Sequence, residues 1–177
     1  MRRSRGLTLI EAVIFIVVVA VGLAGIIPAM TLAGRHNADP LVRRQALALA
    51  ESLLAEVELQ PFTTCDPSGP PATPGGACVV AQGSGPEAGE SRTSTSAPFN
   101  HVLDYNGFSM GPSTGGILAA DGTVVPGLAG YSVSVQVATG ATLGTLPAAD
   151  VARIQVTVTG PDGVPVSLAG YRTRQPQ

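Results

Sequence analysis

An uncharged stretch near the N-terminus constrains this chain more than any other feature. Residues 12–34 carry no charged side chain and are mostly Val, Ile, Leu, Ala and Gly. At about 1.5 Å of rise per residue, a helix over this stretch is roughly 34 Å long, enough to cross a hydrocarbon core of about 30 Å. The stretch therefore predicts a transmembrane helix.

Arginines precede this stretch and predict its orientation. Arg2, Arg3 and Arg5 have no acidic residue among them. Because cytoplasmic flanks of membrane helices carry an excess of Lys and Arg, the N-terminus is expected in the cytoplasm. The remaining chain is then exported.

Glu11 is the single acidic residue in this region, and it has apolar residues on both sides. A carboxylate inside a membrane helix costs on the order of 2.5–3.5 kcal/mol, so it indicates a function and requires a cationic partner. Residues 12–34 contain no Lys, Arg or His. The alternative is that Glu11 lies at headgroup level as an ordinary interfacial residue.

The segment Arg5–Glu11, RGLTLIE, followed by the apolar run, resembles the class III signal of type IV pilins and pseudopilins. The resemblance implies that Gly6 precedes the bond cut by prepilin peptidase and that Leu7 becomes the N-methylated first residue. It assigns Glu11 to the family's carboxylate and Pro28 to a position where the helix bends. Leu7 departs from the more common Phe.

Cleavage after Gly6 would expose an α-amine, whose reference pKa is about 7.7–8.0. In a filament this amine could pair with Glu11 of a neighbouring subunit, in a core where unpaired charges are costly. An alternative is a secretory signal peptide cut after Ala33, with Thr31 as a second small residue. The length of the apolar region and the carboxylate at its start oppose this alternative.

Composition indicates one modest domain beyond the apolar helix. Charged residues make up 12%, Gly numbers 22 and Pro 15, and Trp is absent. The net charge is −2, and removal of three of the ten basic side chains with the leader leaves seven against twelve acidic ones, near −5. This balance does not favour a nucleic-acid or anionic-lipid partner.

The two cysteines, Cys65 and Cys78, lie in the part predicted to be exported. In an oxidising compartment such a pair predicts one disulfide, worth about 3 kcal/mol for a loop of this size. The alternative is two unrelated thiols. Because His36 and His101 lack metal-ligand spacing to the cysteines, no metal site is predicted.

The sequence predicts five segments. They are a basic leader (1–6), a transmembrane and filament-core helix (7–34), an amphipathic helix (35–60), a Pro/Gly-rich loop with the cysteine pair (61–98) and an antiparallel sheet region (99–177). Asp39–Pro40 is a helix-start pair. The sequence leaves open whether the amphipathic helix continues the membrane helix or is separated from it at residues 37–40, and it favours a break or kink there. The buried face of the amphipathic helix is predicted to contain Val42, Ala46, Leu49, Leu53 and Val57, whereas Arg43, Arg44, Glu51, Glu56 and Glu58 are expected to be mostly solvated.

Local signals describe the C-terminal half. In the loop, residues from about Gln82 to Ser96 are expected to be mobile. Asn106–Gly107 and Asp121–Gly122 predict turns. Strict alternation predicts strands at Tyr131–Val137 and Ile154–Val158, and Val151–Thr159 is expected to form a hairpin with Val164–Arg172. The predicted fold is α+β and pilin-like: a long hydrophobic N-terminal helix plus an amphipathic helix packed on an antiparallel sheet.

Four further strings look like those of MshD-type minor pilins of mannose-sensitive haemagglutinin (MSHA) pili. They are Asn37–Glu51, Gln60–Pro67, Asp104–Met110 and Gly170–Arg174. This resemblance implies a minor pilin of a Gram-negative bacterium that primes pilus assembly or enters the filament. The implied partners are prepilin peptidase, the major and other minor pilins, the inner membrane and the pilus assembly platform.

Catalytic motifs are not found, so neither an enzyme nor a cofactor is predicted. The acids beside turn signals are predicted to form turns. The alternative for them is calcium, bound by Asp104 and Asn106 or by Asp121. Alternative functions are a type II secretion pseudopilin and a signal-anchored periplasmic binding or adhesive domain. Only the pilin and pseudopilin interpretations require processing at Gly6.

Overall fold

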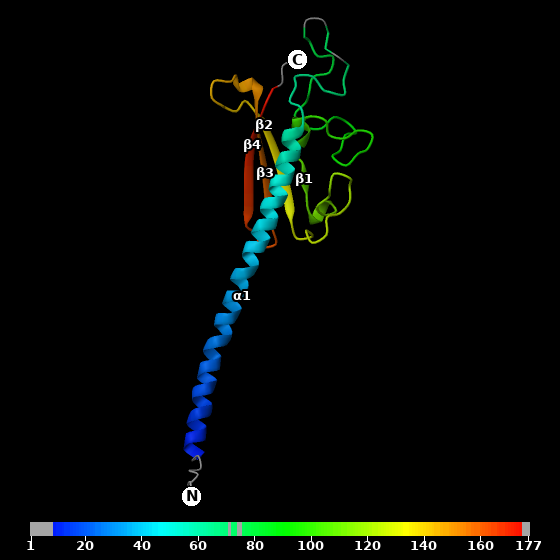
Figure 1. The fold of residues 1–177 in the computed structure, drawn as a ribbon. Coiled ribbons are helices and arrows are strands. Elements are labelled where there is room, and N and C mark those ends of the chain that lie inside the picture. Colours follow the sequence, from blue (N-terminus) through cyan, green and yellow to red (C-terminus); the bar gives the residue numbers. More distant parts are fainter. Residues whose placement is uncertain (1–8, 71, 74–75, 175–177) are drawn as a thin grey trace. The chain divides into compact units, whose positions relative to one another are not determined.

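The computed structural model describes residues 9–70, 72–73 and 76–174, and for residues 25–39 it describes the helix without the side chains. The chain divides into two compact units, Met1–Leu41 and Val42–Gln177. One α-helix, α1 (Leu9–Leu59), contributes to both units (Figure 1). The leader 1–6 and the predicted methylation site Leu7 lie outside the described residues.

In the first unit, the described side chains of α1 at residues 9–24 are all exposed. Its large apolar side chains range from 41% exposed at Val19 to 84% at Leu9. Successive residues of an α-helix point in directions about 100° apart, so an unbroken apolar run covers every face of the helix. This part of α1 therefore has apolar side chains all round, which is typical of helices that are covered by lipid or by other helices.

The expected break at residues 37–40 is not found. The helix is continuous through Asp39–Pro40, so this pair does not start a second helix. Proline removes one backbone hydrogen bond from a helix interior, but the backbone hydrogen bonds of the neighbouring residues can maintain the helix on both sides of it. The division between the two units nevertheless falls at Leu41–Val42, immediately after this proline.

The second unit contains a four-stranded antiparallel sheet in the order β1-β2-β3-β4. The strands are β1 (Ser109–Met110), β2 (Ser132–Thr139), β3 (Val151–Thr159) and β4 (Pro165–Thr173). Short 3₁₀ helices are η1 (Val102–Tyr105), η2 (Pro112–Thr114) and η3 (Ala148–Asp150). Residues 42–59 of α1 pack on one face of this sheet (Figure 1), so the predicted α+β architecture is confirmed.

The core lies between that helix segment and the sheet. The predicted helix face is confirmed, with Ala46, Leu53 and Val57 buried and Val42 and Leu49 partly buried against the core. The alternation predicted for the strands is confirmed too, since the valines at every second position of β2 are buried. The sheet side of the core includes Val133, Val135, Val137, Ile154, Val156 and Val158.

The predicted C-terminal hairpin is confirmed. β3 and β4 pair along their whole length, from Thr159 opposite Pro165 to Val151 opposite Thr173. Gly163 has a φ of 74° in the connecting turn, a left-handed conformation that glycine adopts without strain. The Asp162 carboxylate accepts a hydrogen bond of 3.1 Å from the Val164 N–H, which fixes the same turn.

Both predicted turns upstream are present. At Asn106–Gly107, the Phe108 N–H donates to the Tyr105 carbonyl oxygen at 3.1 Å. At Asp121–Gly122, the Gly122 N–H donates to Ala119, but the flanking residues form only a single bridge, between Leu118 and Val124. The second turn therefore closes a short β-like loop rather than a hairpin of two full strands.

Candidate functional site

The candidate site in the first unit is the start of α1. Glu11 lies in the first turn of this helix and is exposed. Among the described residues it has neither a hydrogen-bond partner nor an ion-pair partner. The positive end of the helix dipole stabilises an acid here by a few tenths of a kcal/mol to about 1 kcal/mol, much less than a paired cation provides. Glu11 is therefore a carboxylate to which the described residues supply no cation, on an apolar stretch of helix.

The other predicted residues of this region are not described in the same detail. Gly6 and Leu7 lie outside the described residues, and so does the side chain of Pro28, which is inside α1. The kink assigned to Pro28 stays a prediction. The predicted membrane span, 7–34, also extends beyond the described side chains. Where side chains are described, no helical segment is both long and apolar enough to span a membrane.

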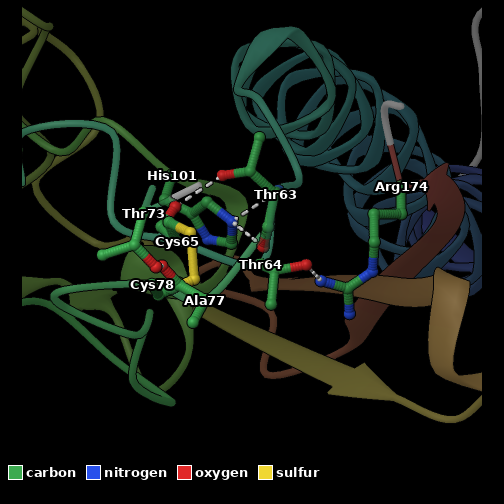
Figure 2. The surroundings of a disulfide bond; sticks show 8 residues. All are labelled: Thr63, Thr64, Cys65, Thr73, Ala77, Cys78, His101 and Arg174. Carbon is green, nitrogen blue, oxygen red and sulfur yellow. Dashed lines mark hydrogen bonds between the residues drawn. A yellow bond between two sulfur atoms is a disulfide. The ribbon is translucent and has the colours of Figure 1, made fainter. Parts of the chain in front are cut away.

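The predicted disulfide is present in the second unit. Cys65 and Cys78 are joined, with Cα atoms 5.2 Å apart (Figure 2). Next to it, Cys65 forms an antiparallel bridge with Ala81, and the Gln82 N–H donates to the Thr64 carbonyl oxygen at 3.2 Å. The disulfide and this short backbone pairing close the same loop at its base.

His101 lies beside the disulfide and contacts Thr63, as Figure 2 shows. The side chain is fully buried, and its Nδ1 accepts the Leu103 N–H at 3.1 Å. On the other side of the ring, Nε2 accepts the Thr63 N–H at 2.9 Å and lies 3.2 Å from the Thr63 carbonyl oxygen. Burial lowers the pKa of His101, against the effect of its hydrogen bond to Thr63. His101 is thus a buried side chain that hydrogen-bonds the backbone of Thr63 and of Leu103.

The sequence did not predict a buried ion pair that fixes the loop to α1. Arg92 donates from Nε and Nη2 to the two carboxylate oxygens of Glu56, both at 2.7 Å. The Tyr105 hydroxyl donates to the same carboxylate at 2.8 Å, and Arg92 Nη1 donates to the Leu118 carbonyl oxygen at 2.8 Å. Burial opposes the charge of Arg92, but the hydrogen bond and charge of Glu56 outweigh it and raise the Arg92 pKa.

The loop segment predicted to be mobile is therefore held by polar contacts. The Arg92 side chain is only 8% exposed. Glu56, expected to be solvated, is the acid that binds it. Sequence periodicity could not reveal this pair, because its members are 36 residues apart and one of them lies in a segment without periodicity.

The structure does not assemble either calcium site considered from the sequence. Asn106 does not join Asp104; its amide donates to Ser84 Oγ at 3.1 Å and accepts the Val137 N–H at 3.0 Å. Asp121 accepts bonds from the N–H and hydroxyl of Thr123 within its own turn. Asp121 is thus a turn-forming residue, as predicted from its position.

Comparison with known proteins gives one family match. Residues 1–27 match the model of the prokaryotic N-terminal methylation motif. Neither the curated proteins nor the solved structures include a match to the chain. The motif supports a type IV pilin or pseudopilin and implies processing by a prepilin peptidase and assembly with pilins. It also implies a protein that is first anchored in a membrane and then reaches the pilus surface.

Proposed function

We propose that this chain is a minor pilin of an MSHA-like type IV pilus, a non-enzymatic subunit without a cofactor. In this role it primes pilus assembly or enters the filament as a minor component. One observation carries the proposal: inside the matched motif, Glu11 is a carboxylate with no cationic partner among the described residues, in the first turn of a helix that is apolar on every described face.

The chemistry of assembly follows from the apolar surface of the helix and from the carboxylate of Glu11. An apolar surface on all sides favours cover by lipid before assembly and by neighbouring helices afterwards. Moving Glu11 into such a surrounding is costly unless a cation accompanies it. Cleavage after Gly6 supplies one, the α-amine of Leu7 on an adjacent subunit. The pair then fixes the axial register of one subunit on the next.

The topology and the partners belong to the same proposal. The N-terminus lies in the cytoplasm and residues 42–177 lie in the periplasm before transfer to the pilus. A disulfide in the second unit supports this placement, because disulfides persist in the periplasm and not in the cytosol. Prepilin peptidase, the major and other minor pilins, the inner membrane and the assembly platform are the partners.

The finer assignment to MshD-type subunits is supported by where the resembling strings lie. Asp104–Met110 spans the end of η1, the Asn106–Gly107 turn and β1. Gly170–Arg174 includes the end of β4, and Gln60–Pro67 leads into the disulfide. Each string thus occupies a position that shapes the second unit.

The test is the amount of subunit in sheared, purified pili relative to the membrane pool. Glu11→Ala should insert in the membrane and be cut after Gly6, because the change only makes the helix more apolar. Incorporation should fail, since a broken buried pair costs about 3–5 kcal/mol. Even the low end is more than a hundredfold in an equilibrium constant.

Glu51→Ala is the matched control, because Glu51 is an exposed acid on α1 within the second unit. This variant should enter pili at the wild-type level. Near-normal incorporation of Glu11→Ala would contradict the role given to Glu11. Absence of the wild-type chain from pili, together with a loss of type II secretion when it is deleted, would assign it to the pseudopilins instead.

A further inference from the structure

The strand β4 forms one edge of the sheet (Figure 1). On its inner side, all nine residues pair with β3. At the opposite edge of the sheet, the chain before β1 covers part of β2, since the Gly107 N–H donates to the Val135 carbonyl oxygen at 3.1 Å and the Val135 N–H donates to Phe108 at 2.9 Å. Among the described residues, none forms a backbone hydrogen bond with the outer side of β4.

The pairing of β4 with β3 identifies the backbone groups on this outer side. Alternate residues of an antiparallel edge strand direct both N–H and C=O toward the neighbouring strand, and the residues between them direct both outward. The Arg174 N–H donates to the Asp150 carbonyl oxygen at 2.8 Å, in the register that continues the pairing of the two strands. Even-numbered residues of β4 therefore face β3. Four exposed residues direct their N–H groups outward: Ser167, Ala169, Tyr171 and Thr173.

The edge lacks the features that usually prevent strand pairing. Natural edge strands are protected by prolines, lysines, bulges or a short length. β4 has nine residues, its register with β3 is unbroken, and its only proline is Pro165 at the first position. Its only charged residue is Arg172, whose Nε donates to the Gln60 carbonyl oxygen at 3.1 Å. The outer side of β4 can therefore accept another strand.

The side chains of β4 indicate which residues an added strand would contain. On the helix face, Val166 and Leu168 pack against the core and stay partly exposed. Apolar side chains at every second position of an added strand would cover them. On the other face, Ser167 and Thr173 are exposed, which suits polar side chains at the positions between.

The carboxylate of Glu58 lies over the same edge. This side chain of α1 packs so closely on Gly170 of β4 that a Cβ at Gly170 would collide with the carboxylate. Glu58 is half-buried and, within the described part of the chain, forms neither a hydrogen bond nor an ion pair. A partly buried carboxylate is stabilised by a nearby cation. A Lys or Arg opposite Gly170 on an added strand would supply one.

A second copy of β4 is less well matched to this edge. Antiparallel pairing that uses all four outward N–H groups and stays within β4 is possible in two registers. These registers place Gly170 opposite either Gly170 or Leu168 of the second copy. Neither supplies a cation to Glu58, and both bring two such carboxylates to one face of the sheet, where like charges repel. The charge therefore favours a segment of a different protein.

We propose that the outer side of β4 binds an extended segment of a partner protein, which adds a fifth strand to the sheet. Backbone hydrogen bonds supply the affinity, as in other cases of strand addition. The segment carries apolar side chains opposite Val166 and Leu168 and a Lys or Arg opposite Gly170. The proposal concerns Val42–Gln177 alone and goes beyond the assembly role given to Glu11, so each can fail while the other stands.

The probe is a nine-residue peptide with blocked ends, Thr-Val-Thr-Lys-Thr-Val-Thr-Val-Thr, and its control contains Gln in place of Lys. Hydrogen exchange of the full chain in detergent, followed by NMR at each amide, locates the binding. The Lys peptide should slow the exchange of the four outward N–H groups. The inward N–H groups already bond β3, so their exchange should change little; they belong to Val166, Leu168, Gly170 and Arg172.

Ala169→Pro tests the backbone contact. This change removes one outward N–H, and the proline ring fills the place of the incoming strand, whereas the control Ala169→Thr keeps the N–H. The proline variant should bind the Lys peptide at least about tenfold more weakly, and the threonine variant should bind it like the wild type. Slow exchange of the inward N–H groups verifies that each variant keeps the pairing of β3 with β4.

Glu58→Gln tests the charge, and its result does not depend on whether the proline variant folds. It should lower the affinity for the Lys peptide about fivefold and leave the affinity for the Gln peptide unchanged. The control Glu51→Gln, at an exposed acid of α1, should bind both peptides like the wild type.

Three results would overturn the proposal. The first is that the Lys peptide does not bind, or slows the exchange of amides other than the four outward ones. The second is equal binding of the Lys and Gln peptides by the wild type. The third is slow exchange of the outward N–H groups at high protein concentration without any peptide, which would assign the edge to a second copy.

Discussion

Glu56 shows how much of the second unit depends on single polar residues. Its carboxylate binds Arg92 from the loop and Tyr105 from η1 while it lies on α1. Three segments that are distant in sequence therefore meet at one side chain. Because the pair is largely enclosed, with 8% and 27% exposure for the two side chains, loss of one partner leaves the other uncompensated.

Arg92→Met tests this contact. The variant keeps much of the apolar stem and removes the charge, so Glu56 is left partly buried without its cation. We expect a loss of about 3 kcal/mol in the free energy of unfolding, measured by urea denaturation. In the background of Glu56→Gln the same change should cost much less, because the charge to be compensated is already gone.

The exposed Arg44 provides the control for this series. Arg44→Met should alter the free energy of unfolding by no more than about 0.5 kcal/mol. An equally small effect of Arg92→Met would show that the ion pair does not hold the loop.

At the residue scale, the sequence predicts the residues whose signal is local. The disulfide could be predicted from the expected compartment and from the spacing of the two cysteines, and it is present. The contacts between Arg92 and Glu56 and between Gln82 and Asp104 join residues that are 36 and 22 positions apart, respectively. Residue type and periodicity carry no information about such distant pairs, so these contacts required the structure.

At the scale of elements, the disulfide and the loop that it closes are the parts most open to experiment. The bridge spans 13 residues. Cys65→Ser/Cys78→Ser should lower the free energy of unfolding by about 3 kcal/mol, because the unfolded chain regains the entropy of the open loop. Urea denaturation of the variant and of the oxidised wild type measures the difference, and reduction of the wild type should reproduce it.

The reactivity of Cys65 and Cys78 in the exported protein shows whether the disulfide forms in the cell. If both cysteines of protein taken directly from the periplasm react with an alkylating reagent before reduction, the disulfide is not a feature of the exported chain. Reactivity only after reduction is the expected result.

Some secondary-structure elements could be predicted from the sequence and others could not. The alternation in β2 and β3 and the turn at Asp162–Gly163 are local, and the structure confirms the hairpin that they predict. The Asp39–Pro40 pair gave a false helix start. A capping signal indicates only that a helix can begin at that position. It does not prevent a helix that begins earlier in the sequence from continuing through the same residues.

At the scale of the whole molecule, the chain consists of two compact units whose described side chains differ in exposure. In the first unit, residues 9–24 of α1 present exposed apolar side chains on every face, whereas Val42–Gln177 has its own core between helix and sheet. The matched motif covers residues 1–27, which places the family signal in the first unit. The proposed role in a pilus therefore depends on how the start of the first unit is processed.

Intact-mass measurement and N-terminal sequencing of the mature protein test that processing most directly. We expect a chain that lacks Met1–Gly6 and begins at an N-methylated Leu7. Gly6→Leu should keep the whole leader, because a side chain at this position should not fit the peptidase. A mature wild-type chain that begins at Met1, or at Gly34 after signal-peptide cleavage, would contradict the assignment to the pilins.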